Sequence, residues 1–249
     1  MKKHLSVLGL FASSSLFKIM AVIVAMCAAE FIFFYLEFRE AIGAYESVVE
    51  ISRPEKMVEN SGMFFCFGVA FIIITVILCL SGTNYTSKCE YTLKRLRVSE
   101  SFVFLYKSVF NVIAYMIMWV AQAAVCFLAV KYYVASAPVD AIGSQTAFLA
   151  FYRSELLHAT VPMADISVWV RNIVSVLTIG VCAAEFPYLE RRKRFSVAVI
   201  AFGIYTILNW KIDLDSLIMT VFTIVIAIIV LSSVAYHVLG DTEEEDNET

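Results

Sequence analysis

Six long apolar runs dominate the sequence, and they constrain its fold more than any other feature. A helix needs roughly 20 apolar residues to cross a hydrocarbon core about 30 Å thick. Of the 249 residues, 61% are hydrophobic and 16% charged, whereas a soluble domain has roughly 45–50% and about 25%. The predicted fold class is therefore all-α, a polytopic membrane protein with six transmembrane helices. The fifth run is short, so it is either a thin span or a poorly bounded one. The predicted spans are Ile19–Phe38, Gly62–Leu80, Phe102–Val130, Ile166–Phe186, Phe195–Trp210 and Ser216–Leu239.

The spans divide the chain into three regions. Residues 1–18 mix apolar and basic side chains, which favours an amphipathic helix lying on the inner membrane surface. Residues 19–239 form the six-helix transmembrane domain. Residues 240–249 are strongly acidic, which is typical of a disordered cytoplasmic tail.

Lysine and arginine are unevenly distributed between the loops, and their excess marks the cytoplasmic side of a membrane protein. With six spans, both termini lie on one side, and the short loops on that side are basic. We therefore expect a multi-pass protein of the plasma membrane with both termini cytoplasmic. Loops 39–61 and 131–165 then face outward. The second contains apolar stretches such as residues 147–152, and we expect it to carry a short helix on the outer surface. The basic residues on the cytoplasmic side are Lys2, Lys3, Lys18, Lys88, Lys94, Arg95, Arg97 and Arg191–Arg194.

The cysteines do not have the pattern of a disulfide framework. None lies in the two longest outer loops, and five lie in or beside apolar runs, so we expect them to act as small packing residues. The six are Cys27, Cys66, Cys79, Cys89, Cys126 and Cys182.

The sequence carries no motif of a known catalytic or metal site. It has no Gly-x-x-x-x-Gly-Lys-Ser/Thr phosphate loop and no His-Glu-x-x-His motif, and its three histidines are scattered. We therefore predict no catalytic residue, no metal site, no cofactor bound by this chain and no nucleic-acid partner. A small intramembrane enzyme that uses Glu30 or Asp165 stays an alternative.

Two charges fall inside predicted spans, where each costs about 2.5–3.5 kcal/mol on insertion scales. Glu30 and Arg171 lie at similar depths in the outer half of their spans. We therefore expect an intramembrane ion pair between them. The alternative is that Arg171 extends outward and Glu30 faces a wet cavity. Glu185, at the inner end of the fourth span, is expected to reach the interface or to meet Arg191–Arg194. Three amides could bond between helices: Asn111, Gln122 and Asn209.

The segment Cys89–Ser99 is short and basic, and it lies between the second and third spans. One interpretation is an anchor that binds anionic lipid, at about 1 kcal/mol per basic residue. Ser99 or Ser101 is expected to cap the helix that follows.

The second interpretation rests on a family resemblance. Glu90-Tyr91-Thr92-Leu93, then Leu96, Val98-Ser99 and a later lysine, resemble the loop between the second and third spans of type-2 ABC exporter permeases. In that family the segment is a cytoplasmic coupling helix that docks into an ATPase subunit. The resemblance implies that Glu90, Tyr91, Leu93 and Leu96 face the ATPase and that Lys107 lies at the cytoplasmic mouth of the third span. Arg97 stands where the family usually has proline.

The resemblance implies a permease subunit that moves a substrate across the membrane. ATP and Mg are expected on the separate, cytoplasmic ABC ATPase subunit. A second permease copy or a similar permease would complete the transporter, and membrane lipids surround it. The alternative is a membrane scaffold or accessory protein that transports nothing and uses the basic loop to hold lipid or a partner.

Overall fold

Helices account for all regular structure in the part of the chain that is described. The computed structural model describes residues 2–45, 53–81, 83, 99–138, 142–143, 145–163, 165–194, 196–211 and 216–247. No strand occurs within these ranges, so the all-α prediction is confirmed. The helices are α1 (Lys2–Tyr45), α2 (Pro54–Asn60), α3 (Met63–Leu80), α5 (Glu100–Ser136), α6 (Thr146–Arg153), α7 (Glu155–Thr160), α8 (Ile166–Arg191), α9 (Ala198–Lys211) and α10 (Ser216–Asn247).

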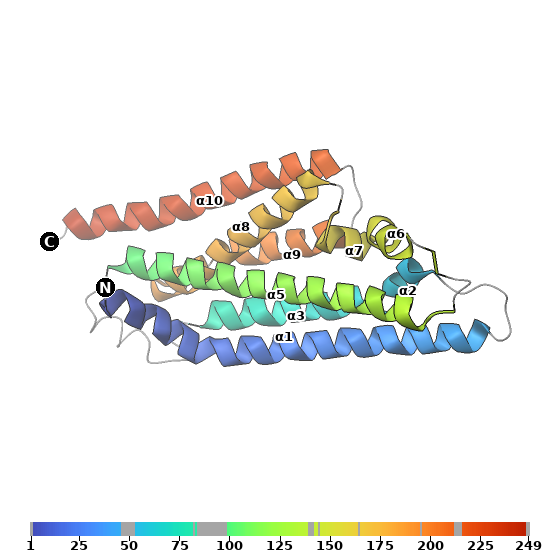
Figure 1. Cartoon of the computed structure of the whole chain (residues 1–249). Coiled ribbons are helices and arrows are strands. Elements are labelled where there is room, and N and C mark those ends of the chain that lie inside the picture. Colours follow the sequence, from blue (N-terminus) through green and yellow to red (C-terminus); the bar gives the residue numbers. More distant parts are fainter. Residues whose placement is uncertain are drawn as a thin grey trace.

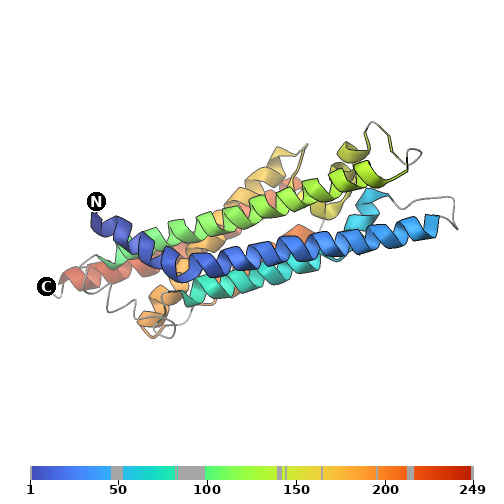
Figure 2. The same ribbon diagram turned by 60° about the horizontal axis from the view of Figure 1, so that its bottom comes forward.

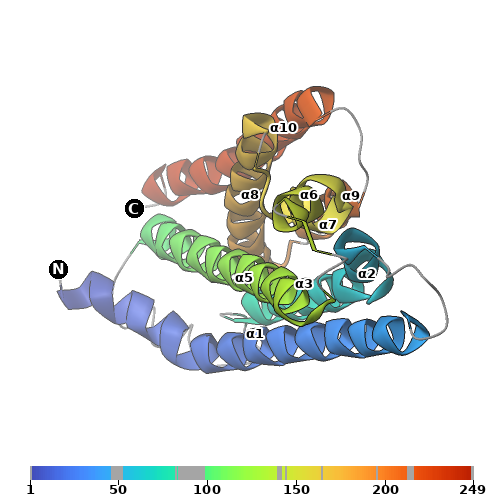
Figure 3. The ribbon, with the colours of Figure 1, turned by 45° about the vertical axis from the view of Figure 1, so that its right-hand side comes forward.

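The long helices form an elongated bundle (Figure 1). The start of α1 and the end of α10 lie at the same end of it, which we call the terminal end. α1 packs against α3 and α5, α5 packs against α8, and α8 packs against α9 and α10. α5 therefore lies between α1 and α8, as Figure 3 also shows.

Five of the described helices are long and apolar enough to cross a membrane: α1, α3, α5, α8 and α10. This supports a multi-pass membrane protein, with five such helices where six spans were expected. The fifth run forms α9, whose 14 residues measure about 21 Å at about 1.5 Å per residue. That length is less than the core of about 30 Å.

α1 is one continuous helix of 44 residues. The sequence predicts a separate surface helix over residues 1–18, but no break falls at Lys18. The hydroxyl of Ser15 donates to the carbonyl oxygen of Phe11 at 2.7 Å, so this serine is satisfied inside the helix. The N-terminal part of α1 is inclined to the rest of the helix (Figure 2).

Three short helices cover the end of the bundle opposite to the termini, here called the far end (Figure 3). α6 and α7 lie in loop 131–165, where a short helix was expected. Arg153 of α6 lies 3.7 Å from Glu55 of α2, which links the two loops 39–61 and 131–165. Gly62 has φ 73° between α2 and α3, a left-handed conformation that glycine adopts without strain.

α5 and α8 approach each other closely at Gly180. A Cβ atom at this position would lie 2.5 Å from Val112 Cγ2 and 3.0 Å from the Val112 backbone nitrogen. Asn111 Nδ2 also donates to the Gly180 carbonyl oxygen at 3.2 Å. Small residues allow membrane helices to approach in this way.

Apolar side chains also cover the outside of the bundle, as expected of helices that face lipid. Exposed examples are Phe17, Val120, Leu217, Ile218 and Ile229. The five cysteines in the described residues are free thiols, as expected.

α10 continues to Asn247 and includes most of the residues expected to form a disordered tail. Glutamate has high helix propensity, and the helix continues past Gly240 through Glu243–Glu245 without a proline in between. The sequence-based boundary at residue 240 was therefore too early.

Candidate functional site

Lys107 joins three helices at the terminal end of the bundle. Its side chain on α5 is buried, with 4% of the residue exposed. Its ammonium group donates to the carbonyl oxygen of Ser81, at the C-cap of α3. It also lies 5.6 Å from the centre of the Phe11 ring of α1. A cation at this position complements the partial negative charge at the end of α3.

The first turn of α5 is tied to the last turn of α8. Arg192 Nη2 lies 3.3 Å from Glu100 Oε2, and the Arg192 guanidinium lies 4.7 Å from the centre of the Tyr188 ring. Ser99 occupies the N-cap position of α5, as expected, but its side chain makes no capping hydrogen bond. α5 is therefore held at its start by two neighbours, α8 through Arg192 and α3 through Lys107.

The segment between α3 and α5 carries the other predicted coupling residues. Glu90, Tyr91, Leu93 and Leu96 lie outside the described residues. The structure therefore places Lys107 alone among the five. It also places both flanks of that segment, the end of α3 and the start of α5, at the terminal end of the bundle (Figure 1).

A second polar cluster at this end surrounds Glu185. The residue is buried, with 1% exposed. Ser196 Oγ donates to Glu185 Oε2 at 2.7 Å, and His237 Nδ1 lies 2.9 Å from Glu185 Oε1. Glu185 thus joins α8 to α10 and to the residues before α9; these partners differ from the expected Arg191–Arg194.

The Glu185 cluster does not have the order of a catalytic triad. In a triad the base contacts the nucleophile and the acid orients the base. Here the Ser196 hydroxyl and the His237 ring each contact the carboxylate instead. The arrangement suits an interhelical linkage.

The two intramembrane charges lie on different sides of α5. Glu30 on α1 is fully buried, and Arg171 on α8 is 5% exposed. Within the described part of the chain, neither carboxylate oxygen of Glu30 has a hydrogen-bond partner. The Gln122 side chain of α5 is its polar neighbour. The expected hydrogen-bonded contact between Glu30 and Arg171 is therefore not formed.

No protein-family model matches the chain, and no curated protein or solved structure shows significant similarity to it. The site is therefore interpreted from its own residues.

Three amide side chains were predicted to form hydrogen bonds between helices, and two of them do. Asn111 donates to Gly180 of α8, and Asn209 Nδ2 of α9 donates to Thr223 Oγ1 of α10 at 3.2 Å. Gln122 Nε2 instead lies 3.7 Å from the sulfur of Cys126 on its own helix.

The contacts of Ser196 and His237 with Glu185 were not predicted. His237 follows Glu185 by 52 residues, and no local pattern links residues so far apart. The only signal in the sequence was that Glu185 lies near the end of an apolar run. A buried charge there needs a partner, but the sequence does not show which residue that partner is.

Proposed function

We propose that the chain is the permease subunit of an ABC-type exporter, whose separate cytoplasmic ATPase subunit binds ATP and Mg. In this proposal the protein lies in the plasma membrane with both termini cytoplasmic. A second permease copy or a similar permease completes the pathway for the substrate. Residues 86–99 would form the coupling helix.

The contact of Lys107 with Ser81 carries the proposal. It fixes the two flanks of segment 86–99 to each other, because Ser81 ends α3 and Lys107 belongs to α5. A partner that pushed on the segment would therefore move α3 and α5 together.

α5 supplies a path for such a movement into the bundle. It is a continuous helix of 37 residues, about 55 Å long at about 1.5 Å per residue. It packs against both α1 and α8, and it ends beside the short helices of the far end (Figure 1). A displacement at its start would reach both faces of the bundle.

The proposal is tested by co-purification in a mild detergent. The tagged chain should retain a soluble ATPase, detected as ATP hydrolysis in the eluted fraction. Replacing Glu90→Ala together with Leu96→Ala should reduce the retained ATPase activity by at least tenfold while membrane insertion stays normal.

A matched double variant at the far end provides the control. Glu155→Ala with Leu149→Ala removes the same two side-chain types from α7 and α6 and should leave ATPase retention unchanged. If the native chain retains no ATPase, the proposal fails and a non-transporting scaffold becomes the better interpretation. Equal losses in both double variants would also contradict it.

A further inference from the structure

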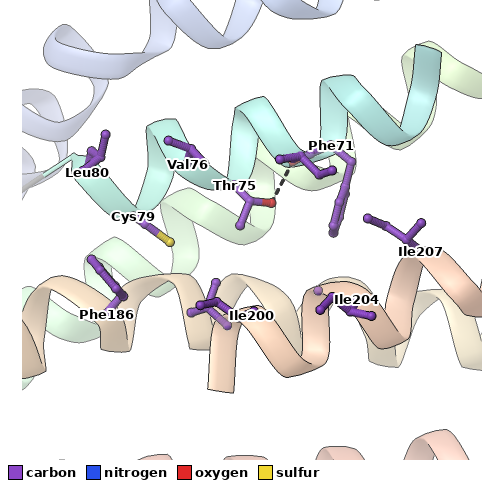
Figure 4. Close-up of a pocket in the computed structure, with 12 residues that line it drawn as sticks. Phe71, Thr75, Val76, Cys79, Leu80, Phe186, Ile200, Ile204 and Ile207 are labelled. Atoms are coloured by element: carbon purple, nitrogen blue, oxygen red, sulfur yellow. Dashed lines mark hydrogen bonds between the residues drawn. The ribbon is translucent and has the colours of Figure 1, made fainter. Parts of the chain in front are cut away.

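An apolar groove lies between α3 and α9 on the outside of the bundle (Figure 4). Its volume is about 400 Å³, within the range of roughly 300–1,000 Å³ of small-molecule sites. The floor includes the buried side chains of Phe71, Cys79 and Val199, and the exposed side chains of Val76 and Ile204 form its rims.

The groove offers no free hydroxyl, amide or charged group to a ligand. Its hydroxyl, on Thr75, donates to the Phe71 carbonyl oxygen at 2.7 Å and accepts from the Tyr115 hydroxyl at 2.8 Å. An occupant must therefore be apolar along the groove. Towards the far end, Trp210 lies against Phe67 and Phe71, with ring centres 4.5 Å and 5.5 Å apart.

At its other end the groove is lined by residues that lie a few positions along the chain from the basic turn between α8 and α9. Phe186 of α8 and Val199 in the first turn of α9 line this end, and Arg192, Lys193 and Arg194 lie in the chain between them. Arg192 contacts Glu100, while Lys193 and Arg194 are exposed. A polar, basic surface thus adjoins the end of an apolar groove.

The backbone holds Lys193 in place. Its φ is 59°, in the left-handed region that favours glycine. The amide of Arg194 donates to the Leu189 carbonyl oxygen at 2.9 Å, and the amide of Lys193 donates to the Glu190 carbonyl oxygen at 3.0 Å. These two bonds form a Schellman motif, in which glycine usually occupies the position of Lys193. A lysine therefore occupies a position at which glycine would be less strained.

We propose that the groove between α3 and α9 binds an anionic phospholipid, with an acyl chain in the groove and the phosphate beside Lys193. The charge of the turn matches the phosphate, and the apolar lining matches the chain. A transmembrane helix does not fit, because one helical turn about 10 Å wide and 5.4 Å long occupies roughly 420 Å³ by itself. The proposal is independent of any ATPase.

Lys193→Gly is the sharpest variant, because it removes the cation at a position where the backbone favours glycine. The purified protein in detergent is titrated with dioleoyl phosphatidylglycerol or dioleoyl phosphatidylcholine, and bound lipid is counted by native mass spectrometry. The native chain should prefer phosphatidylglycerol. Lys193→Gly should reduce that preference about fivefold, since a basic residue near a phosphate contributes about 1 kcal/mol.

Filling the groove tests the acyl-chain contact. Ile204→Trp should reduce the binding of both lipids several-fold, whereas Ile228→Trp, an exposed position on α10, should leave binding unchanged. Inorganic phosphate at millimolar concentration should not displace the lipid. An unchanged lipid preference in Lys193→Gly, equal binding by the two tryptophan variants, or displacement by phosphate alone would each overturn the proposal.

Discussion

The ammonium group of Lys107 donates a hydrogen bond to the backbone carbonyl oxygen of Ser81, and so joins α5 to the end of α3. The two residues are 26 positions apart, and the intervening segment contains the basic stretch that distinguishes this sequence. The contact thus joins the helix that precedes this segment to the helix that follows it.

Lys107→Met should destabilise the protein by about 1.5–3 kcal/mol, the usual range for a lost hydrogen bond to a charged group. Methionine keeps the apolar part of the side chain but leaves the Ser81 carbonyl without this donor. The change is measured by denaturant titration in detergent micelles. Lys131→Met, at an exposed position near the other end of α5, should alter stability by less than about 0.5 kcal/mol. Equal losses of stability in the two variants would show that the Lys107–Ser81 hydrogen bond does not stabilise the protein.

Gly180→Ala should destabilise the bundle by about 1–3 kcal/mol, the range for overpacked interiors. The new methyl group would collide with Val112 and force α5 away from α8. Val112→Ala should recover only part of the loss, because the Val112 backbone nitrogen would still lie 3.0 Å from the methyl group. Thermal unfolding in micelles measures both effects.

Gly68→Ala is the control for this experiment. A Cβ atom on Gly68 meets no atom within 4 Å, and alanine has higher helix propensity than glycine. The variant should be as stable as the native chain or slightly more stable. A lower melting temperature in Gly68→Ala than in Gly180→Ala would refute the close approach at Gly180.

Ser196→Ala and Glu185→Leu should show coupled effects on stability. The serine change removes one hydrogen bond from a buried carboxylate, and the leucine change leaves Ser196 and His237 without their shared acceptor. The double variant should cost less than the sum of the single changes by about 0.5–3 kcal/mol. Additive losses would show that the carboxylate does not depend on Ser196.

Glu30→Gln should leave stability unchanged or raise it. The carboxylate oxygens have no hydrogen-bond partner in the described residues, and a neutral amide avoids the burial of a charge. The loss caused by Arg171→Gln should therefore add to the effect of Glu30→Gln. A double variant that is more stable than the sum predicts would instead favour the ion pair inferred from the sequence.

Helix bounds were predictable where an apolar run ends at polar or helix-breaking residues. The prediction for α3 was 62–80 and the helix covers Met63–Leu80, while α8 begins at Ile166 as expected. The continuity of α1 was harder to predict. The basic residues among its first 18 made its first part appear to be a separate surface helix. Its serines do not break the helix, because serines can bond to the preceding turn, as Ser14 and Ser15 do.

The contacts between helices were less predictable than the helices themselves. Asn111 and Asn209 could be identified as interhelical donors because an amide inside a span needs a partner. The identity of the partner depends on how helices are rotated against each other, which the apolar pattern does not specify. Gly180 illustrates this limit, since only its distance from Val112 explains why glycine stands there.

The length of α9 bears on the surrounding bilayer. A helix of about 21 Å is shorter than an average hydrocarbon core by about 9 Å, and such a mismatch is relieved by local thinning of the bilayer or by flanking side chains that reach the interface. The lipids beside α9 would therefore be compressed relative to those around α1. If α9 crosses the bilayer, membrane thickness thus becomes a variable to which this side of the protein would respond.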